Sequence, residues 1–148
     1  MSEISDILKD ELATLKADVI QRHEQSGQVA SGRTRASFDE YLTSEYSGVL
    51  EGAGYSGVLE KGRKAGKVPY DFKDILQRWA QAKGLTFATQ SDFNRWAYFV
   101  TKKIREEGTA LYRSQQQEDI FTTPIAEFTE RLSDRVATFF ETEIKNQI

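Results

Sequence analysis

The 148-residue chain has the usual size of one domain, and its 39% hydrophobic and 29% charged residues exclude both a disordered chain and a membrane-embedded one. No apolar run approaches the roughly 18 residues of a membrane span, and the acidic, amphipathic start is unlike a signal peptide, so we expect a soluble intracellular protein. The lack of cysteine excludes disulfides and thiolate zinc sites, and a net charge of −3 gives no overall attraction for nucleic acid.

The start of the chain, residues 2–26, is predicted to form a long amphipathic helix. Its apolar residues recur on one helical stripe: Ile4, Leu8, Leu12, Leu15 and Val19. Ser2 is expected to cap the helix and Gly27 to end it. The single histidine, His23, is expected to be a surface or capping residue, because neither a cysteine nor a second histidine is available to work with it in catalysis.

The next stretch predicts a small antiparallel sheet. Residues 28–36 lack periodicity and are expected to form an exposed loop, whereas residues 37–43 read as a strand. The hexapeptide Tyr-Ser-Gly-Val-Leu-Glu then occurs twice, at residues 46–51 and 55–60, with Gly-Ala-Gly at residues 52–54 between the copies. Glycine favours tight turns, so we expect the copies to form a β-hairpin and the sheet to have about three strands.

The rest of the chain reads as three helices joined by polar segments. A helix that Asp71 caps is expected to end at Gly84, and a second helix is expected over about residues 91–107. Residues 109–122 form a polar, glutamine-rich connector, which at this length is typical of a functional or mobile segment. Thr123 is expected to cap the last helix, with proline at its first position.

These elements predict an α+β fold in one domain, residues 1–148. The N-terminal helix occupies about residues 2–26, the β-hairpin sheet region about residues 37–62, and the helical region about residues 71–148. We expect the long N-terminal helix and several C-terminal helices to pack on one side of the small antiparallel sheet.

A glycine-punctuated basic loop follows the second hexapeptide and is the one compact cluster of cations. Its charged residues are Lys61, Arg63, Lys64 and Lys67. A phosphate-binding P-loop requires four residues between its glycines and a Ser or Thr after the lysine, whereas this loop has three residues and Val68. Two interpretations remain open for the four cations: contact with a nucleic-acid backbone, or a solvated loop that meets an acidic neighbour.

Residue types that carry catalysis or hold metals are scattered along the chain. The adjacent carboxylates of residues 106–107 and 118–119 would point apart on a helix, and nothing nearby predicts an apolar pocket that would shift their pKa values. The sequence has no histidine cluster and no acidic loop with alternating oxygen ligands. We therefore expect no catalytic, cofactor-binding or metal-binding residues, and a protein that is not an enzyme.

Between residues 27 and 110 the chain carries short motifs in a definite order. Ser31–Ser37 has the order small residue, glycine, any residue, aliphatic position, two residues and serine, with Thr34 at the aliphatic position. Tyr55, Glu60 and Gly62 follow at a set spacing. The pattern continues with Pro69, Ile75, Trp79, Lys83, Gly84, Lys103, Ile104, Arg105, Gly108 and Thr109. This order resembles that of the tail-completion proteins of tailed bacteriophages, also called neck or head-tail joining proteins.

The resemblance implies a structural subunit of the virion that forms a ring of six or twelve copies at the head-tail junction. Such a ring would join portal or connector proteins to tail proteins, with no enzymatic activity, cofactor or membrane. It implies a location in the neck or tail region of the virion after assembly in the host cytoplasm. The 61–69 loop and the 109–122 connector are then expected to contact neighbouring subunits, and DNA in the ring's channel would be a secondary, non-specific contact.

Two rival functions remain open. The first is a small nucleic-acid-binding module that uses the basic loop at residues 61–67, for which steep salt dependence of binding is typical. The second is an enzyme or toxin-like intracellular factor, which requires an enclosed polar pocket with clustered ionisable groups.

Overall fold

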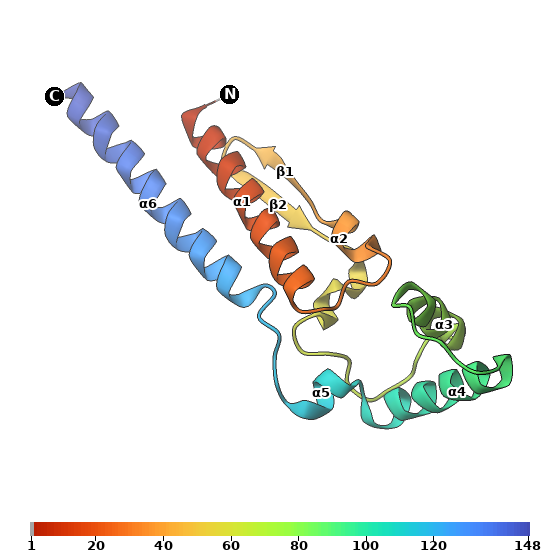
Figure 1. The fold of residues 1–148 in the computed structure, drawn as a ribbon. Coiled ribbons are helices and arrows are strands. Elements are labelled where there is room, and N and C mark those ends of the chain that lie inside the picture. Colours follow the sequence, from red (N-terminus) through yellow and green to blue (C-terminus); the bar gives the residue numbers. More distant parts are fainter. Residues whose placement is uncertain (1) are drawn as a thin grey trace.

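The computed structural model describes residues 2–148, apart from the side chain of Tyr55, and has an α+β fold (Figure 1). Its helices are α1 (Glu3–Gln25), α2 (Arg33–Ser37), the 3-10 helix η1 (Gly54–Val58), α3 (Phe72–Ala82), α4 (Gln90–Glu107), α5 (Ala110–Ser114) and α6 (Thr122–Gln147). Its strands are β1 (Asp39–Ser44) and β2 (Ser47–Glu51). None of the described helices is long and apolar enough to cross a membrane.

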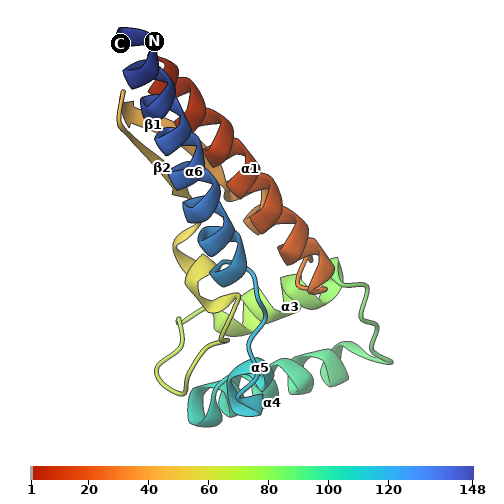
Figure 2. The same ribbon diagram turned by 90° about the vertical axis from the view of Figure 1, so that its left-hand side faces the viewer.

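The larger part of the molecule is built around α1. The helix α6 runs alongside α1, and the hairpin of β1 and β2 packs on another side of it (Figures 1 and 2). The core cluster consists of Leu15, Val19, Phe38 and Ile120, so the predicted stripe of α1 is confirmed as a buried face. We call residues 2–60 and 115–148 the body, and residues 61–114 the arm.

A buried ionic contact ties α6 to α1. The side chain of Glu11 is 7% exposed and accepts hydrogen bonds from Arg131 Nε at 2.8 Å and Arg135 Nη1 at 3.1 Å. Burial alone would raise the pKa of Glu11, but the hydrogen bonds and positive charges of the two arginines outweigh it and hold that pKa below its usual value. Glu11 therefore stays ionised, and its two oxygens fix α6 against α1.

Both predicted ends of α1 are confirmed. The hydroxyl of Ser2 accepts a hydrogen bond from the Ser5 amide at 3.2 Å, which satisfies one of the free amides at the helix start. The helix ends at Gln25, and Gly27 follows with a φ of 76°, a conformation that glycine adopts without strain.

The hairpin is formed by different segments from those predicted. The predicted strand at residues 37–43 appears two residues later as β1, which pairs antiparallel with β2. The connecting turn is residues 45–46, so the predicted turn at residues 52–54 is wrong. The turn contains no glycine, and instead the Ser44 hydroxyl accepts a hydrogen bond from the Tyr46 amide at 3.1 Å.

The two copies of the hexapeptide adopt different structures. The first copy contributes β2, and its Gly48 lies so close to α1 that a Cβ there would collide with Leu12. The second copy lies largely in η1, so the sheet of the described chain has two strands and not about three. Ser56 of that copy is buried, and Glu60 at its end binds the start of α6. Contacts with α1 and α6, rather than the hexapeptide itself, decide between strand and 3-10 helix.

The arm consists mainly of α3 and α4, which pack on each other at the base of the body (Figures 1 and 2). The rings of Phe87, Phe93 and Trp96 lie with their centres 4.8 to 6.1 Å apart. Neither α3 nor α4 packs extensively on the sheet, so the expectation of several C-terminal helices on the sheet is wrong for these two. Of the long C-terminal helices, α6 joins the body, and it does so through α1.

The ends of the arm helices follow the predictions, with one exception. Gly84 and Gly108 end α3 and α4 with φ values of 78° and 88°. The side chain of Asp71 makes no capping hydrogen bond, although α3 begins at the next residue. The start of α4 is capped by Thr89, whose hydroxyl accepts from the Asp92 amide at 3.0 Å.

Both segments predicted to lack structure contain short helices. The connector at residues 109–122 holds α5, and the end of the loop at residues 28–36 begins α2. The helix α6 starts at Thr122, one residue before the predicted cap. Thr123 donates its amide to Asp119 Oδ1 at 2.9 Å, so Asp119 supplies the cap that had been expected from Thr123.

The position of His23 differs from the expected surface site. His23 is 1% exposed, and its Nδ1 has no hydrogen-bond partner among the described residues. Burial lowers the pKa of His23, and it outweighs the neighbouring Gln28 side chain and the charge of Glu24, both of which raise that pKa. The positive charges of Arg35 and Lys83 lower it further. The imidazole is therefore neutral in the folded protein near pH 7.

We expect the free energy of unfolding to fall as the pH is lowered from about 7 to about 5. Below the ordinary histidine pKa of 6.5 the unfolded chain takes up a proton on His23 that the folded chain resists, so acid favours unfolding. The variant His23→Gln should lose this pH dependence, and no other imidazole can mimic it because the chain has one histidine. Urea unfolding at three pH values measures the slope. Equal slopes in both proteins would contradict the burial argument.

Candidate interface surfaces

The four cations predicted as a candidate site lie together in the loop that follows Glu60. Lys61, Lys64 and Lys67 are exposed, whereas Arg63 is half-buried. The Arg63 guanidinium donates to the Lys67 carbonyl at 2.7 Å and lies 5.6 Å from the centre of the Phe72 ring. None of the four forms an ion pair with a carboxylate in the part of the chain that the structure describes. The loop therefore presents three lysines to solvent, and Arg63 helps to shape it.

The basic loop packs on the 109–122 connector. Arg63 exchanges two hydrogen bonds with Thr109, from the Thr109 amide to the Arg63 carbonyl at 2.9 Å and from the Arg63 amide to Thr109 Oγ1 at 2.9 Å. The Gly66 amide donates to the Arg105 carbonyl at 2.9 Å. The two segments that were predicted to contact neighbours separately thus form one continuous surface at the end of α4.

Glu60 joins this loop to the body. Its Oε1 accepts hydrogen bonds from the Phe121 amide at 2.5 Å and the Thr122 amide at 2.7 Å, at the start of α6. A carboxylate in this position satisfies free amides and interacts favourably with the positive end of the helix dipole. Sequence reasoning placed Glu60 in a motif but gave it no structural role, because its partners lie about 60 residues away along the chain.

Formal charge is divided unevenly between the two parts of the molecule. The arm has twelve Lys and Arg residues and five Asp and Glu residues, which gives a formal charge of +7. The body has eight Lys and Arg residues and eighteen Asp and Glu residues, which gives −10. The overall charge of −3 hides this division. Counting charges by segment would have revealed it from the sequence, although only the fold defines the two parts.

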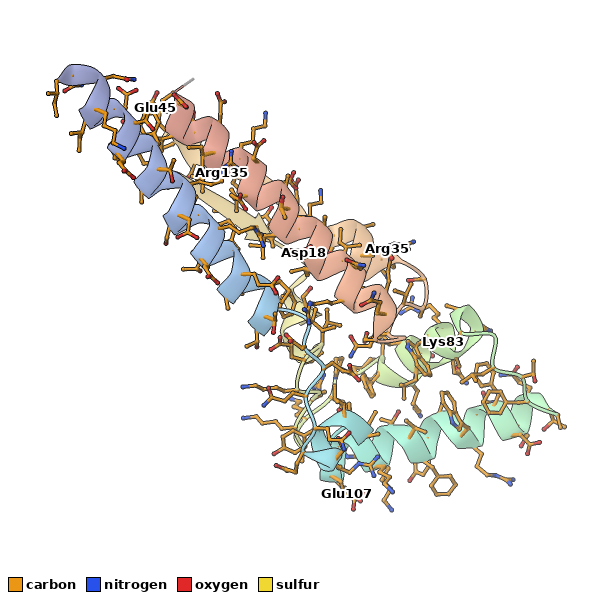
Figure 3. The ribbon with its side chains drawn as sticks, turned by 60° about the vertical axis from the view of Figure 1, so that its left-hand side comes forward. Asp18, Arg35, Glu45, Lys83, Glu107 and Arg135 are labelled. Atoms are coloured by element: carbon orange, nitrogen blue, oxygen red, sulfur yellow. The ribbon has the colours of Figure 1, made fainter. Side chains whose placement is uncertain are left out.

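Ion pairing follows the same division. Six cations of the body pair with carboxylates: Lys16, Arg22, Arg35, Arg131, Arg135 and Lys145. Among the described arm residues, only Lys103 does so, with Glu107 of its own helix at 3.8 Å. Figure 3 labels Asp18, Arg35 and Arg135 in the body and Lys83 and Glu107 in the arm. The positive charge of the arm is therefore largely left without partners inside the described chain.

An acidic stripe runs along the outer side of α6. Its members are exposed and recur at helical spacing: Glu127, Glu130, Asp134 and Glu141. Glu127 lies one helical turn before Arg131, which faces α1 together with Arg135, so the stripe borders the side of α6 that packs on α1. Glu141 pairs with Lys145 at 3.0 Å, and the other three have no ion pair with a described residue. Three carboxylates of α6 thus face solvent without a cation.

The body also has an open apolar groove of about 560 Å³ between α1, β2 and α6. Leucines 8, 12 and 15 of α1 form one wall, and Phe128 and Leu132 of α6 form another. Glu51 is the only charged residue of the lining. The groove lies on the body, away from the basic loop of the arm, and it lacks the clustered ionisable groups that acid–base chemistry requires.

No group of three or more His, Asp or Glu residues that could hold a metal ion occurs among residues 2–148 as the structure describes them. The geometry instead consists of charged and apolar surfaces on two parts of the molecule. Comparisons with protein-family models, with curated proteins and with solved structures find no match.

We expect Gly108→Ala to destabilise the arm more than Gly84→Ala. Both glycines have positive φ values, but Gly108 also has a ψ of 177°, a conformation almost confined to glycine, so alanine there costs about 1–3 kcal/mol of backbone strain. At Gly108 a Cβ would also stand 2.7 Å from the Arg63 carbonyl, whereas nothing lies within 4 Å at Gly84. The additional cost at Gly108 is about 1–3 kcal/mol.

Hydrogen exchange of the Thr109 amide measures this effect directly, since that amide binds the Arg63 carbonyl. The exchange should accelerate in Gly108→Ala and change little in Gly84→Ala. Equal effects of the two substitutions would show that the basic loop does not pack on Gly108.

Proposed function

We propose that this chain is a structural, non-enzymatic subunit of a tailed-bacteriophage virion, which forms a ring at the head-tail junction and joins portal to tail. The ring would contain six or twelve copies, be located in the neck or tail region, and be assembled in the host cytoplasm. The proposal rests on the order of motifs between residues 27 and 110 and on the surface of the molecule.

The observation that carries the proposal is the amount of exposed surface. The chain exposes 9864 Å², whereas a compact monomer of 16.9 kDa exposes about 7,700 Å². Each partner contributes roughly 800 Å² to a standard interface, so the excess of about 2,200 Å² is more than twice that area. A subunit with a neighbour on each side requires two such patches, as in a heterologous ring.

The motif residues hold the backbone in particular conformations and contacts. This favours a motif that preserves a fold over one that preserves a catalytic reaction. Gly32 precedes α2 with a φ of 84°, and the Ser37 hydroxyl accepts a hydrogen bond from the Ala53 amide at 3.0 Å. Glu60 caps α6, and Gly62 has a φ of 77° where the loop meets Thr109. Gly32 and Ser37 therefore shape the body, and Glu60 and Gly62 fix the junction of the body and the arm, while the surfaces outside them are left for contacts with neighbours.

A second candidate is a small nucleic-acid-binding module that uses the loop at residues 61–67. The observation in its favour is that Lys61, Lys64 and Lys67 are exposed and have no described ion-pair partner. Four cations can neutralise a few phosphates, and such binding weakens steeply with salt. If the loop faced the channel of a ring, it would make a non-specific contact with DNA there.

The ring is tested by measuring the mass of the purified protein alone and after mixing with a portal ring, for example by native mass spectrometry. We expect a closed complex of six or twelve copies in the presence of the portal, because the two exposed patches are then occupied. A chain that stays monomeric and does not bind the portal or a tail protein would overturn the proposal. Tight, salt-sensitive DNA binding by that monomer would favour the second candidate.

A further inference from the structure

We propose that the basic arm of one copy docks on the acidic outer face of α6 in the next copy, so that neighbouring copies associate head to tail. This inference deepens the proposed ring and rests on it, because it names the two surfaces through which copies would meet. The arm surface is the loop with Lys61, Lys64 and Lys67, and the opposite surface is the α6 stripe with Glu127, Glu130 and Asp134.

Charge complementarity identifies a second copy as the partner. The arm carries +7 and the body −10, so one chain contains both halves of an attractive pair. Eleven of the twelve arm cations, and three of the four stripe carboxylates, have no ion pair with a described residue. In contrast, six of the eight cations in the body are paired. Unpaired positive charge is thus spread over the arm, and the α6 stripe is a place on the body where unpaired carboxylates recur along one helix.

The two surfaces do not meet within one chain. Glu60 binds the first amides of α6, and the loop then folds back on Gly108 and Thr109. From that point α6 runs away from the arm, and its C-terminal end lies at the far end of the body (Figures 1 and 2). No ion pair between described residues joins the loop to α6. The arm can therefore reach an α6 stripe only on another molecule.

The two elements that carry the charged surfaces also expose apolar side chains. On α6, Phe140 and Ile144 are 53% and 60% exposed. On the arm, Tyr98 and Phe99 of α4 are exposed. Exposed ion pairs alone add little to affinity, so these apolar contacts would supply much of the binding energy while the charges orient the partners.

A nucleic acid fits these observations less well than a second copy. Its phosphates would match the arm, but they would be repelled by the body, whose charge is −10. Nucleic acid would also leave the acidic stripe and the exposed apolar residues of α6 uncovered. A second copy covers both surfaces, and because the two surfaces differ, each copy has one neighbour on each side, as ring closure requires.

Reversing the charge of each surface tests the inference. The arm variant carries Lys61→Glu, Lys64→Glu and Lys67→Glu, and the stripe variant carries Glu127→Lys, Glu130→Lys and Asp134→Lys. Sedimentation velocity at low salt and high protein concentration should show self-association of the wild type that weakens as salt rises. Each variant alone should associate on the order of 100-fold more weakly, because three attractive pairs become repulsive.

Mixing the two variants should restore association to near the wild-type level. The acidic arm of the arm variant then meets the basic stripe of the stripe variant. The basic arm of the stripe variant meets the acidic stripe of the arm variant, as in the wild type. A matched control carries Lys9→Glu, Arg33→Glu and Arg35→Glu, which changes the formal charge by the same amount as the arm variant but leaves both the arm and α6 intact. The control should associate like the wild type, and circular dichroism checks that every variant is folded.

Three results would overturn the inference. The first is self-association that neither salt nor the reversals weaken, and the second is a mixture that fails to associate although both variants are folded. The third is a wild type that does not self-associate at any salt or protein concentration but still binds the portal as a ring. That result would overturn the docking of arm on α6 and leave the proposed function standing. If the arm variant instead lost binding to a 30-base-pair DNA while wild-type self-association was unchanged, the arm cations would serve nucleic acid.

Discussion

The body depends on the burial of one face of α1. Both the hairpin and α6 pack on this helix, so its apolar stripe provides the common core of segments that are far apart in the sequence. Glu11 adds a polar constraint in the same interface, because an ionised carboxylate at this depth requires partners, and Arg131 and Arg135 are the only cations paired with it among the described residues. Those arginines fix α6 laterally. The outer face of α6 is then free to present its carboxylates to solvent.

The doubled hexapeptide illustrates how far local sequence limits structure. Of the same six residues, the last five form β2 in the first copy, whereas the first four lie in the 3-10 helix η1 in the second. The first copy is held by pairing with β1 and by the close approach of Gly48 to Leu12. The second copy pairs with neither outer edge of the two-stranded sheet, and its final glutamate accepts hydrogen bonds at the start of α6. Strand formation requires a partner, whereas a helix satisfies its hydrogen bonds internally, so the helical predictions were the more accurate ones.

The candidate surfaces were predicted in part. The four cations of the basic loop were identified from the sequence, since they lie within seven residues of a glycine-containing segment. Their docking on Thr109 and the capping role of Glu60 were missed, because each contact joins residues 46 or more positions apart. The helical spacing of the α6 carboxylates can be read from the sequence. Whether these carboxylates face solvent depends on which face of α6 is buried, and in the structure the face with Arg131 and Arg135 packs on α1.

The sequence by itself determined the elements whose signals lie within a few residues: the long helix capped by Ser2, the helix ends at Gly27, Gly84 and Gly108, and the absence of cysteine chemistry. Periodicity and backbone freedom are local properties, so they can be read directly. Only the tertiary structure decided the turn at residues 45–46, the burial of His23, and the separation of an acidic body from a basic arm. These features depend on which distant segments pack together in the core. That choice is made by the packing of the whole chain, so it cannot be read from any short stretch of the sequence.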